Sequence, residues 1–268
     1  MGFERVEVGD CVLYRGDALE VLPALEPGLI DAVVTDPPYS SGGAFRGDRV
    51  QKTVAKYVNS DSRYSPHRDE FSGDSRDQRS FLAWCSLWLA AQRQATSPGA
   101  VLCTFIDWRQ LPVMTDAVQA GGWVWRNLAT WWKPGVRMQR GRFSASAEYL
   151  VYATNGPHDA EDGERSPQNV TSCPPVAGAE KEHIAEKPLA VVGWALGVTR
   201  PGALVLDPFM GSGTTGEACL QTGRRFVGIE IDARSFDVAC RRVEQAQGKG
   251  GLFEAAADRG DLFDAVSD

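Results

Sequence analysis

The hydrophobic pattern of the chain alternates between short apolar runs and stretches with helical spacing. An apolar run of about four to eight residues bounded by turn residues is typical of a buried strand, whereas apolar positions three and four apart are typical of a helix. The pattern predicts strands over residues 29–35, 100–106, 123–132, 147–154, 203–206 and 226–231. It predicts helices over residues 18–25, 81–95, 108–120, 186–196, 214–221 and 233–245. Strands and helices in alternation favour an α/β fold with a largely parallel sheet.

Three stretches depart from this alternation. Residues 1–15 contain two short apolar runs around Gly9-Asp10, which predicts a β-hairpin. Residues 40–80 and 155–182 are rich in glycine, serine and charged residues and have few aliphatic side chains. Long segments of this composition are loops, and long loops are often functional.

Composition narrows the class of protein. Of the 268 residues, 43% are hydrophobic and 24% are charged, as in an ordinary soluble globular protein, which excludes a mostly disordered chain. No apolar run reaches the roughly 18–20 residues that span a bilayer, and the first residues contain no apolar signal core. The six cysteines are scattered and the three histidines are isolated. We therefore expect a reduced, cytoplasmic protein without a membrane anchor, a disulfide framework or a metal site.

A glycine-rich turn separates the predicted strand over 203–206 from the predicted helix over 214–221. Glycines let the backbone approach a ligand closely, and the helix that follows presents free N–H groups. Glu230 ends the next predicted strand, 19 positions after Gly211. A carboxylate at that place accepts hydrogen bonds from ribose hydroxyls. The pattern predicts a site for a cofactor that carries a nucleoside.

Three alternatives compete with this interpretation of the turn. A phosphate-binding P-loop requires Gly-Lys-Ser/Thr, and the turn contains no lysine. A dinucleotide site requires G-x-G-x-x-G, which Gly211, Gly213 and Gly216 match in spacing, although Asp207-Pro208-Phe209 precedes them instead of a glycine-terminated strand. The third alternative is a purely structural turn.

The tetrapeptide Asp36-Pro37-Pro38-Tyr39 follows the predicted strand over 29–35. Its two prolines fix φ and remove two backbone donors, which leaves the carbonyls of Asp36 and Pro37 free. A carboxylate beside a free carbonyl suits an amino group, because an amino group has two N–H donors. The ring of Tyr39 can stack on a planar group. The alternative is a sharp loop without chemistry.

In three segments the sequence resembles the beta group of amino-DNA methyltransferases, which transfer a methyl group from S-adenosylmethionine to an exocyclic nitrogen of a DNA base. The tetrapeptide 36–39 resembles their catalytic motif, and residues 207–215 resemble their cofactor loop. Residues 183–188, His-Ile-Ala-Glu-Lys-Pro, are similar to the stretch that precedes that loop, with Ile184 where proline is commoner. The catalytic motif comes before the cofactor motif, which is the order of the beta group.

The resemblance implies a fold and a domain organisation. The fold would be a Rossmann-like S-adenosylmethionine-dependent methyltransferase fold, with a mostly parallel seven-stranded sheet, a circularly permuted motif order and inserted recognition loops. Residues 1–247 would form one methyltransferase domain. Within it, residues 40–80 would form a lid and residues 133–182 would contain the target-recognition insertions. Residues 248–268 would form an acidic tail.

The resemblance also implies roles for individual residues. Asp36 and the Pro37 carbonyl would accept the hydrogens of the target amino group, and Tyr39 would stack on a flipped base. Asp17 would contact the cofactor adenine, with a helix N-cap as the alternative, and Lys187 would pair with a carboxylate, with a solvated lysine as the alternative. The implied catalytic residues are Asp36, Pro37, Pro38 and Tyr39. The implied cofactor-binding residues are Asp17, Ala18, Asp36, Lys187, Asp207, Phe209, Gly211, Ser212, Gly213, Thr214, Thr215, Glu230 and Ile231.

Taken alone, the net charge of −7 disfavours a nucleic-acid partner, but the charge is unevenly distributed. Residues 254–268 contain five acids and one arginine, whereas residues 117–147 contain no acid and five basic residues. A basic, acid-free loop is typical of a phosphate-contacting surface, and a solvated basic loop is the alternative. The candidate DNA-binding residues are Arg126, Lys133, Arg137, Arg140 and Arg142. We place target recognition in residues 133–146, with 155–182 and the 40–80 lid as second and third candidates.

Several functions remain open at this point. An aspartate at position 36 favours adenine N6 as the target in duplex DNA, and cytosine N4 is the alternative. A protein or RNA methyltransferase is disfavoured by the motif order, and a silent DNA-binding module by the intact motifs. No nuclease motif is visible, so restriction would need a separate protein. Relatives in the beta group are often dimers, so the resemblance also implies a homodimer.

Overall fold

A computed structural model describes residues 2–40, 76–136, 140–141, 143–158, 166–176 and 186–257. The strands are β1 (Glu4–Val8), β2 (Cys11–Arg15), β3 (Ile30–Thr35), β4 (Thr96–Ile106), β5 (Val124–Trp132), β6 (Ala147–Thr154), β7 (Val170–Ser172), β8 (Leu204–Asp207) and β9 (Arg225–Glu230). The helices are α1 (Ala18–Val21), the 3₁₀ turn η1 (Leu22–Ala24), α3 (Gln78–Ala95), α4 (Leu111–Ala120), α5 (Leu189–Leu196), α6 (Thr214–Gln221) and α7 (Ala233–Ala257).

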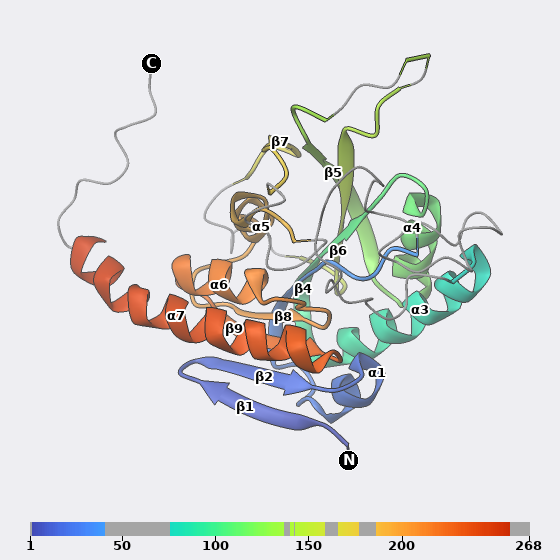
Figure 1. Ribbon diagram of the computed structural model, residues 1–268. Helices are drawn as coiled ribbons and strands as arrows, with labels where there is room; N and C mark the ends of the chain where they lie inside the picture. The colour runs from blue at the N-terminus through green and yellow to red at the C-terminus, as the bar shows by residue number, and fades with distance from the viewer. Residues whose placement is uncertain are drawn as a thin grey trace.

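All these strands belong to one sheet, in the order β1-β2-β9-β8-β3-β4-β6-β5-β7 (Figure 1). Strands β2, β9, β8, β3 and β4 are parallel neighbours, and β6 is antiparallel to both β4 and β5. The expectation of a mostly parallel sheet is confirmed. The expected count of seven strands is wrong, because the sheet has nine within the described residues.

The two additional strands lie at the edges of the sheet. Strand β1 pairs with β2 as the predicted hairpin, whose turn contains Gly9 at a φ of 53°. Strand β7 lies in the segment 155–182, which we expected to be a loop, and pairs with β5 through the register Thr130↔Val170. Val170 and Thr171 are β-branched and suit an edge strand, but three residues are too few to give a periodic signal.

Two hydrophobic clusters cover the two faces of the sheet. One face packs against α5, α6 and α7 through residues such as Val192, Cys219 and Phe236, and the other packs against α1, α3 and α4 through residues such as Phe81 and Met114. Strand residues alternate between the two clusters, as the two-residue period of a strand requires. The molecule is therefore a three-layer α/β/α structure (Figure 1).

The helices agree with the predicted ones except at their ends. Helix α3 ends at Ala95, and β4 begins at Thr96, before the Pro98-Gly99 pair that we expected to separate them. Helix α7 continues to Ala257, twelve residues beyond the predicted end at 245. The glycines at 248, 250 and 251 each disfavour a helix interior by about 1 kcal/mol, which is why the sequence predicts an earlier end. Among the described helices, none is both long and apolar enough to cross a membrane.

The order of the sheet brings the two predicted motifs together. Strand β3, which ends before Asp36, pairs in parallel with β8, which ends at Asp207. Their carboxyl ends therefore meet at one edge of the sheet, where ligands bind in open α/β folds. The Oγ1 of Thr35 donates a hydrogen bond of 2.7 Å to Oδ1 of Asp207, which ties the two strand ends directly.

Candidate active site

The tetrapeptide 36–39 leaves the sheet at the end of the buried strand β3. The Asp36 side chain is 24% exposed, but its Oδ1 is buried and has no hydrogen-bond partner among the residues that the structure describes. A buried acceptor without a partner is costly in a folded protein and marks a place where a donor can bind. Burial raises the pKa of Asp36 above its usual value, although the neighbouring Lys187 lowers it.

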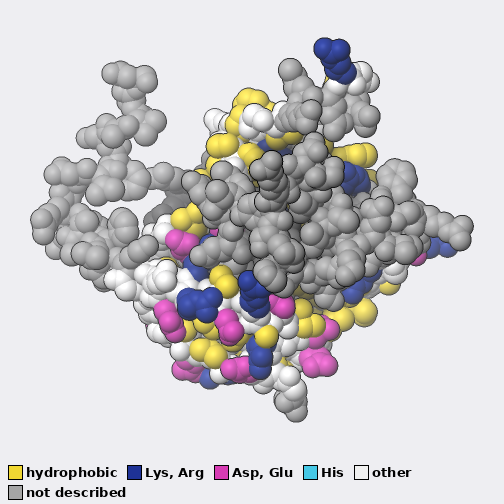
Figure 2. Space-filling view, in the orientation of Figure 1, with side chains coloured by type: hydrophobic (Ala, Val, Ile, Leu, Met, Phe, Trp, Pro, Cys, Tyr) yellow, Lys and Arg dark blue, Asp and Glu magenta, His cyan; other side chains and the backbone are white. Residues whose placement is uncertain are grey.

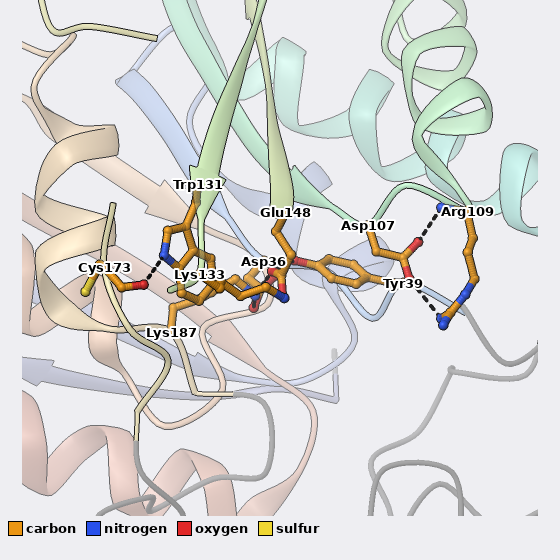
Figure 3. Close-up of polar contacts among 9 residues, drawn as sticks. All are labelled: Asp36, Tyr39, Asp107, Arg109, Trp131, Lys133, Glu148, Cys173 and Lys187. Carbon is orange, nitrogen blue, oxygen red and sulfur yellow. Dashed lines mark hydrogen bonds and ion pairs between the residues drawn. The ribbon is translucent and has the colours of Figure 1, made fainter. Parts of the chain in front are cut away.

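Lys187 contacts the other oxygen of this carboxylate. Its Nζ lies 2.5 Å from Asp36 Oδ2 and 3.1 Å from Glu148 Oε2 (Figure 3). The ammonium also lies 5.0 Å from the centre of the Tyr39 ring and 5.4 Å from that of Phe105. Burial lowers the pKa of Lys187, but the two carboxylates raise it by more. The net pKa lies above the usual value, so the lysine stays charged. The alternative of a solvated lysine is wrong, because its side chain is only 9% exposed.

Glu148 is a site residue that the sequence analysis missed. It lies near the start of β6, and its Oε1 accepts a hydrogen bond of 2.9 Å from Nζ of Lys133. Burial raises the pKa of Glu148, but Lys187 and Lys133 together lower it to about 2. Its signal in the sequence is one acidic residue at the start of an otherwise apolar strand, which is too weak to interpret alone.

Tyr39 completes this group of side chains. Its hydroxyl donates a hydrogen bond of 3.2 Å to Oε2 of Glu148. Burial, Asp36 and Glu148 all raise the pKa of the phenol, so it stays neutral. Figure 3 shows Asp36, Tyr39, Lys133, Glu148 and Lys187 pointing toward one another from the segments that follow β3 and β5, from β6 and from the segment before α5. We refer to these five residues as the charge cluster.

Asp207 organises the glycine-rich turn next to the charge cluster. Its Oδ1 accepts hydrogen bonds from Thr35 and from the backbone N–H of Phe209, at 2.7 and 3.0 Å, and its Oδ2 accepts one of 2.7 Å from Thr215. Burial raises the pKa of Asp207 to about 6, although the hydrogen bonds from Thr215 and Thr35 lower it. The ring of Phe209 packs on α3, with centroids 5.3 Å from Trp84 and 5.1 Å from Trp88.

The two glycines of the turn have different local requirements. Gly211 has a φ of 52°, and a Cβ built there would meet no atom within 4 Å. Open space beside a left-handed glycine is what a bound ligand could occupy. Gly213 has a φ of 86°, and a Cβ there would lie 2.9 Å from the Cα of Ala239 on α7. Gly213 is therefore needed for close packing of the turn on α7.

Glu230, Asp17, Ala18 and Ile231 lie together at the neighbouring strand ends. Arg15 at the end of β2 pairs with Glu230 at the end of β9, and the N–H of Gly16 donates a hydrogen bond of 2.9 Å to the Glu230 carbonyl. The Asp17 carboxylate accepts a hydrogen bond of 2.8 Å from the N–H of Leu19, so its N-cap role is confirmed. Ile231 is 56% exposed. Cofactor contacts by these residues stay predictions.

Glu230 is expected to make stability depend on pH. Its carboxylate accepts backbone N–H bonds from Gly211 and Asp232, at 2.9 and 2.8 Å, yet burial raises its pKa from 4.5 to about 7. The folded state therefore binds this proton more tightly than the unfolded state, and the resulting stability is lost as the pH rises from about 4.5 through about 7. Wild-type stability relative to Glu230→Gln should fall by on the order of 2 kcal/mol from pH 5 to pH 8.

Urea denaturation of both proteins without cofactor, at the two pH values, measures this change. Glu217→Gln, which removes an acid from the neighbouring helix α6, serves as the control. An equal stability difference between wild type and Glu230→Gln at both pH values would contradict the assignment.

The remaining predicted cofactor residues are linked by a second network. Arg242 of α7 donates to Oγ of Ser212 at 3.2 Å and to Oγ1 of Thr214 at 2.7 Å, and it forms an ion pair of 2.7 Å with Glu186. Glu186 precedes Lys187, so this arginine connects the cofactor turn with the segment that carries the lysine. Sequence reasoning missed Arg242, because nothing in the pattern of α7 distinguishes it from other surface arginines.

The three candidate DNA-binding residues that the structure describes lie in different surroundings. Arg137 and Arg142 lie outside the described residues, and Arg140 is exposed. Lys133 belongs to the charge cluster, with 16% of its side chain exposed. Arg126 lies near the start of β5, far from the cluster, and bonds to Oγ1 of Thr154 and to the carbonyl of Gly156, at 3.0 and 3.1 Å.

The surface differs between two regions of the molecule. Hydrophobic side chains gather around β5 and β7 in Figure 2, where Trp132 is 50% exposed and Val170 is 54% exposed. Charges of both signs are interspersed over β1, β2 and α7. Most of the lid over 40–80 lies outside the described residues. Within the described residues, no group of three or more His, Cys, Asp or Glu side chains is arranged to hold a metal ion.

Comparison with known proteins identifies relatives that match most of the length of this chain in sequence or in fold. The sequence model of the N6_N4_Mtase family, described as DNA methylase, matches residues 30–241. The type II methyltransferase M.Cfr9I of Citrobacter freundii is 28% identical over an alignment of 278 positions, which covers 90% of this chain and 90% of that protein. Two solved structures share the fold. The M1.HpyAVI–SAM complex has 24% identity and a TM-score of 0.60, and covers 86% of this chain and 98% of its own. The cytosine-N4-specific PvuII DNA methyltransferase has 15% identity and a TM-score of 0.64, and the match covers 90% of this chain and 92% of that one.

Proposed function

Because the chain belongs to the N6_N4_Mtase family of DNA methylases, we propose that it transfers a methyl group from S-adenosylmethionine to the exocyclic N6 amino group of adenine in duplex DNA. The target base would be flipped out of the helix, since chemistry on a base requires its removal from the stack. The charge cluster and the glycine-rich turn lie at adjacent strand ends, which suits transfer between a bound cofactor and a base.

The observation that carries this proposal is the buried Oδ1 of Asp36, which has no partner among the described residues. An exocyclic amino group has two N–H donors, and Asp36 Oδ1 together with the Pro37 carbonyl offers two acceptors. Accepting these hydrogens keeps electron density on the nitrogen and directs its lone pair toward the methyl group. Lys187 holds the other oxygen of Asp36, so the carboxylate cannot rotate freely.

Tyr39 supports the proposal from the other side of the target. A neutral phenol with its hydroxyl held by Glu148 presents a ring of fixed direction, and a base released from the stack gains about 1–3 kcal/mol by stacking on such a ring. The tetrapeptide thus offers both an amino-binding group and a stacking group on one short, proline-stiffened segment.

The residues of the turn fit S-adenosylmethionine. The open space beside Gly211 allows the cofactor to approach the backbone, and Glu230 places a carboxylate where ribose hydroxyls would lie. Asp17, Ala18 and Ile231 would surround the adenosine end, whereas Phe209, Gly211, Gly213, Thr214 and Thr215 would hold the amino-acid end. When bound, the cofactor supplies an electrophilic methyl group on a sulfonium. The protein supplies orientation and acceptors, and no covalent enzyme intermediate is required.

Cytosine N4 is the second candidate target. Its amino group has the same two donors as adenine N6, so the pair of acceptors at positions 36 and 37 serves either base. The PvuII enzyme, which is cytosine-N4-specific, shares the fold. The aspartate at position 36 is the reason for placing adenine first.

The partner and the setting follow from the substrate. We propose duplex DNA as the partner, with residues 133–146 in target recognition, and a homodimer as the working unit. The expected setting is the cytoplasm of a bacterial or phage-infected cell, where such DNA is found. A type II methyltransferase acts beside a separate restriction enzyme or alone, and either role is compatible with this chain.

One experiment tests the reaction and the base together. The protein is incubated with methyl-labelled S-adenosylmethionine and mixed-sequence duplex DNA, and the DNA is digested to nucleosides. We expect label in N6-methyladenine, and label in N4-methylcytosine would select the second candidate. A folded protein that binds the cofactor but leaves the DNA without label would contradict the proposed function.

A further inference from the structure

We propose that Glu148 is a positioning residue for methyl transfer, because its single carboxylate holds both the ring of Tyr39 and the lysine that pairs with Asp36. The inference rests on the proposed function, since it concerns how Asp36 and the target base are placed. Glu148 lies in none of the three segments that resemble the family. Its importance emerges from contacts between segments that are far apart in the sequence.

Strand pairing brings Glu148 to the reactive edge of the sheet. Glu148 pairs with Trp131 of β5, and the next residue, Tyr149, pairs with Ile106 at the end of β4. Strand β4 is the parallel neighbour of β3, so its carboxyl end lies beside that of β3. Although Glu148 is 112 residues beyond Asp36 in the sequence, it therefore occupies the same edge of the sheet.

Both oxygens of the Glu148 carboxylate are used. Oε1 accepts from Lys133 at 2.9 Å, and Oε2 accepts from Lys187 at 3.1 Å and from the Tyr39 hydroxyl at 3.2 Å. The Glu148 side chain is 17% exposed, so these bonds form where water competes weakly. One carboxylate thus restrains the direction of the stacking ring and the position of the lysine at the same time (Figure 3).

The charges of the cluster explain why this residue is an acid. Asp36 and Glu148 contribute two negative charges, and Lys133 and Lys187 contribute two positive charges. With Glu148 present, Lys187 lies between two carboxylates, both of which raise its pKa. Without the charge of Glu148, Lys187 would keep one carboxylate and would lose its proton at a lower pH. Asp36 would then be held less firmly, and its free oxygen would be aimed less accurately at the amino group.

The groups that face Glu148 come from four segments, which limits the interpretation of any pH effect. Asp36 and Tyr39 follow β3, Lys133 follows β5, and Lys187 precedes α5. Asp207 on β8 is the next carboxyl group, and its own pKa is raised slightly by Asp36. Among these groups, Lys187 and the Tyr39 phenol each have a pKa that both carboxylates raise. Tyr39→Phe, which has no phenol to ionise, separates the effect of the lysine from that of the tyrosine.

The test compares two variants with the wild type in steady-state methyl transfer between pH 6 and pH 10. Glu148→Gln keeps the shape and removes the charge, and kcat is expected to fall about 10- to 100-fold, with the alkaline limb of its pH profile at lower pH. Tyr39→Phe removes the hydrogen bond from the Tyr39 hydroxyl to Glu148 and keeps both the aromatic ring and the charge of Glu148. It is expected to lower kcat several-fold without moving the alkaline limb.

Asp31→Asn is the matched control. Asp31 lies at the opposite end of β3 and accepts from Arg200 Nη2 at 2.9 Å and from the Leu204 N–H at 2.8 Å, so it resembles Glu148 in its bonds but not in its place. The kcat and the pH profile of Asp31→Asn should equal those of the wild type, even if the Tm of this variant falls.

A Glu148→Gln enzyme with lower Tm but with wild-type kcat and pH profile would overturn the proposal, because Glu148 would then be purely structural. If that variant does not fold, an unchanged kcat in Tyr39→Phe would overturn it instead. Failure of the proposed function is a different result. It would appear as absence of label in the wild-type reaction, before any variant is compared.

Discussion

Replacing Asp36 with asparagine is expected to reduce methyl transfer by about 10²–10³-fold at saturating cofactor and DNA. Asparagine has the shape of aspartate but carries no charge, and one of its two terminal groups is an N–H donor. The buried Oδ1, which we propose as an acceptor for the target amino group, would become a weaker acceptor or a competing donor. Interactions of this kind act mainly in the transition state, so the loss should appear in kcat.

Single-turnover labelling of DNA measures the rate, and calorimetric titration with S-adenosylmethionine measures binding. Cofactor affinity should stay within a few-fold of wild type, because it is the neighbouring Thr35 that bonds to Asp207 at the start of the glycine-rich turn, and the variant keeps this bond. A rate within threefold of wild type would remove Asp36 from the mechanism.

Replacing Lys187 with methionine is expected to affect both stability and rate. Removal of one partner from a buried ion pair typically costs about 3–5 kcal/mol, because the remaining charge is left uncompensated. Lys187 is 9% exposed and pairs with two carboxylates, so the cost should lie in that range. Burial and Glu148 raise the pKa of Asp36, and Lys187 lowers it. Without the lysine, the pKa of Asp36 therefore rises further.

The sign of the pH effect follows from this shift. A protonated Asp36 is a poor acceptor, so the variant should be slow near neutral pH and should recover part of its rate as the pH rises and Asp36 ionises. Urea denaturation and a pH–rate profile measure the two effects. Arg200→Met is the control, because Arg200 is 54% exposed in its pair with Asp31 and an exposed pair contributes about 0–1 kcal/mol. An equal, small loss of stability in both variants would argue against a tightly coupled charge cluster.

The parts of the fold that the sequence predicted well are those with strong local signals. The buried strands β3 and β4, the helix α3 and the helix α6 all have clear periodicity, and their predicted centres are confirmed. Strand β7 and the full length of α7 were not predicted. The first depends on an open edge of β5, and the second crosses a glycine-rich junction at which local propensity predicts an earlier end. Neither can be deduced from hydrophobic period alone.

The candidate site shows the same division. Asp36, Tyr39 and Gly211 belong to short motifs whose chemistry can be deduced from neighbouring residues. Glu148 and Arg242 act through tertiary contacts, so no local pattern reveals them. Lys133 illustrates the difficulty most clearly. The acid-free window that suggested DNA contact ends at residue 147, and the acid that pairs with Lys133 is the next residue.

The pairing of β3 with β8 also has a consequence for how the protein is made. Thr35 and Asp207, which join the two strand ends, are 172 positions apart. At a synthesis rate of roughly 5–20 residues per second, β3 would leave the ribosome about 10–30 s before β8. Throughout that interval one edge of β3 has no partner strand and exposes backbone groups that pair readily with other chains. The nascent chain would therefore be open to pairing with other chains during that interval, and activity could begin only after the last strands are synthesised.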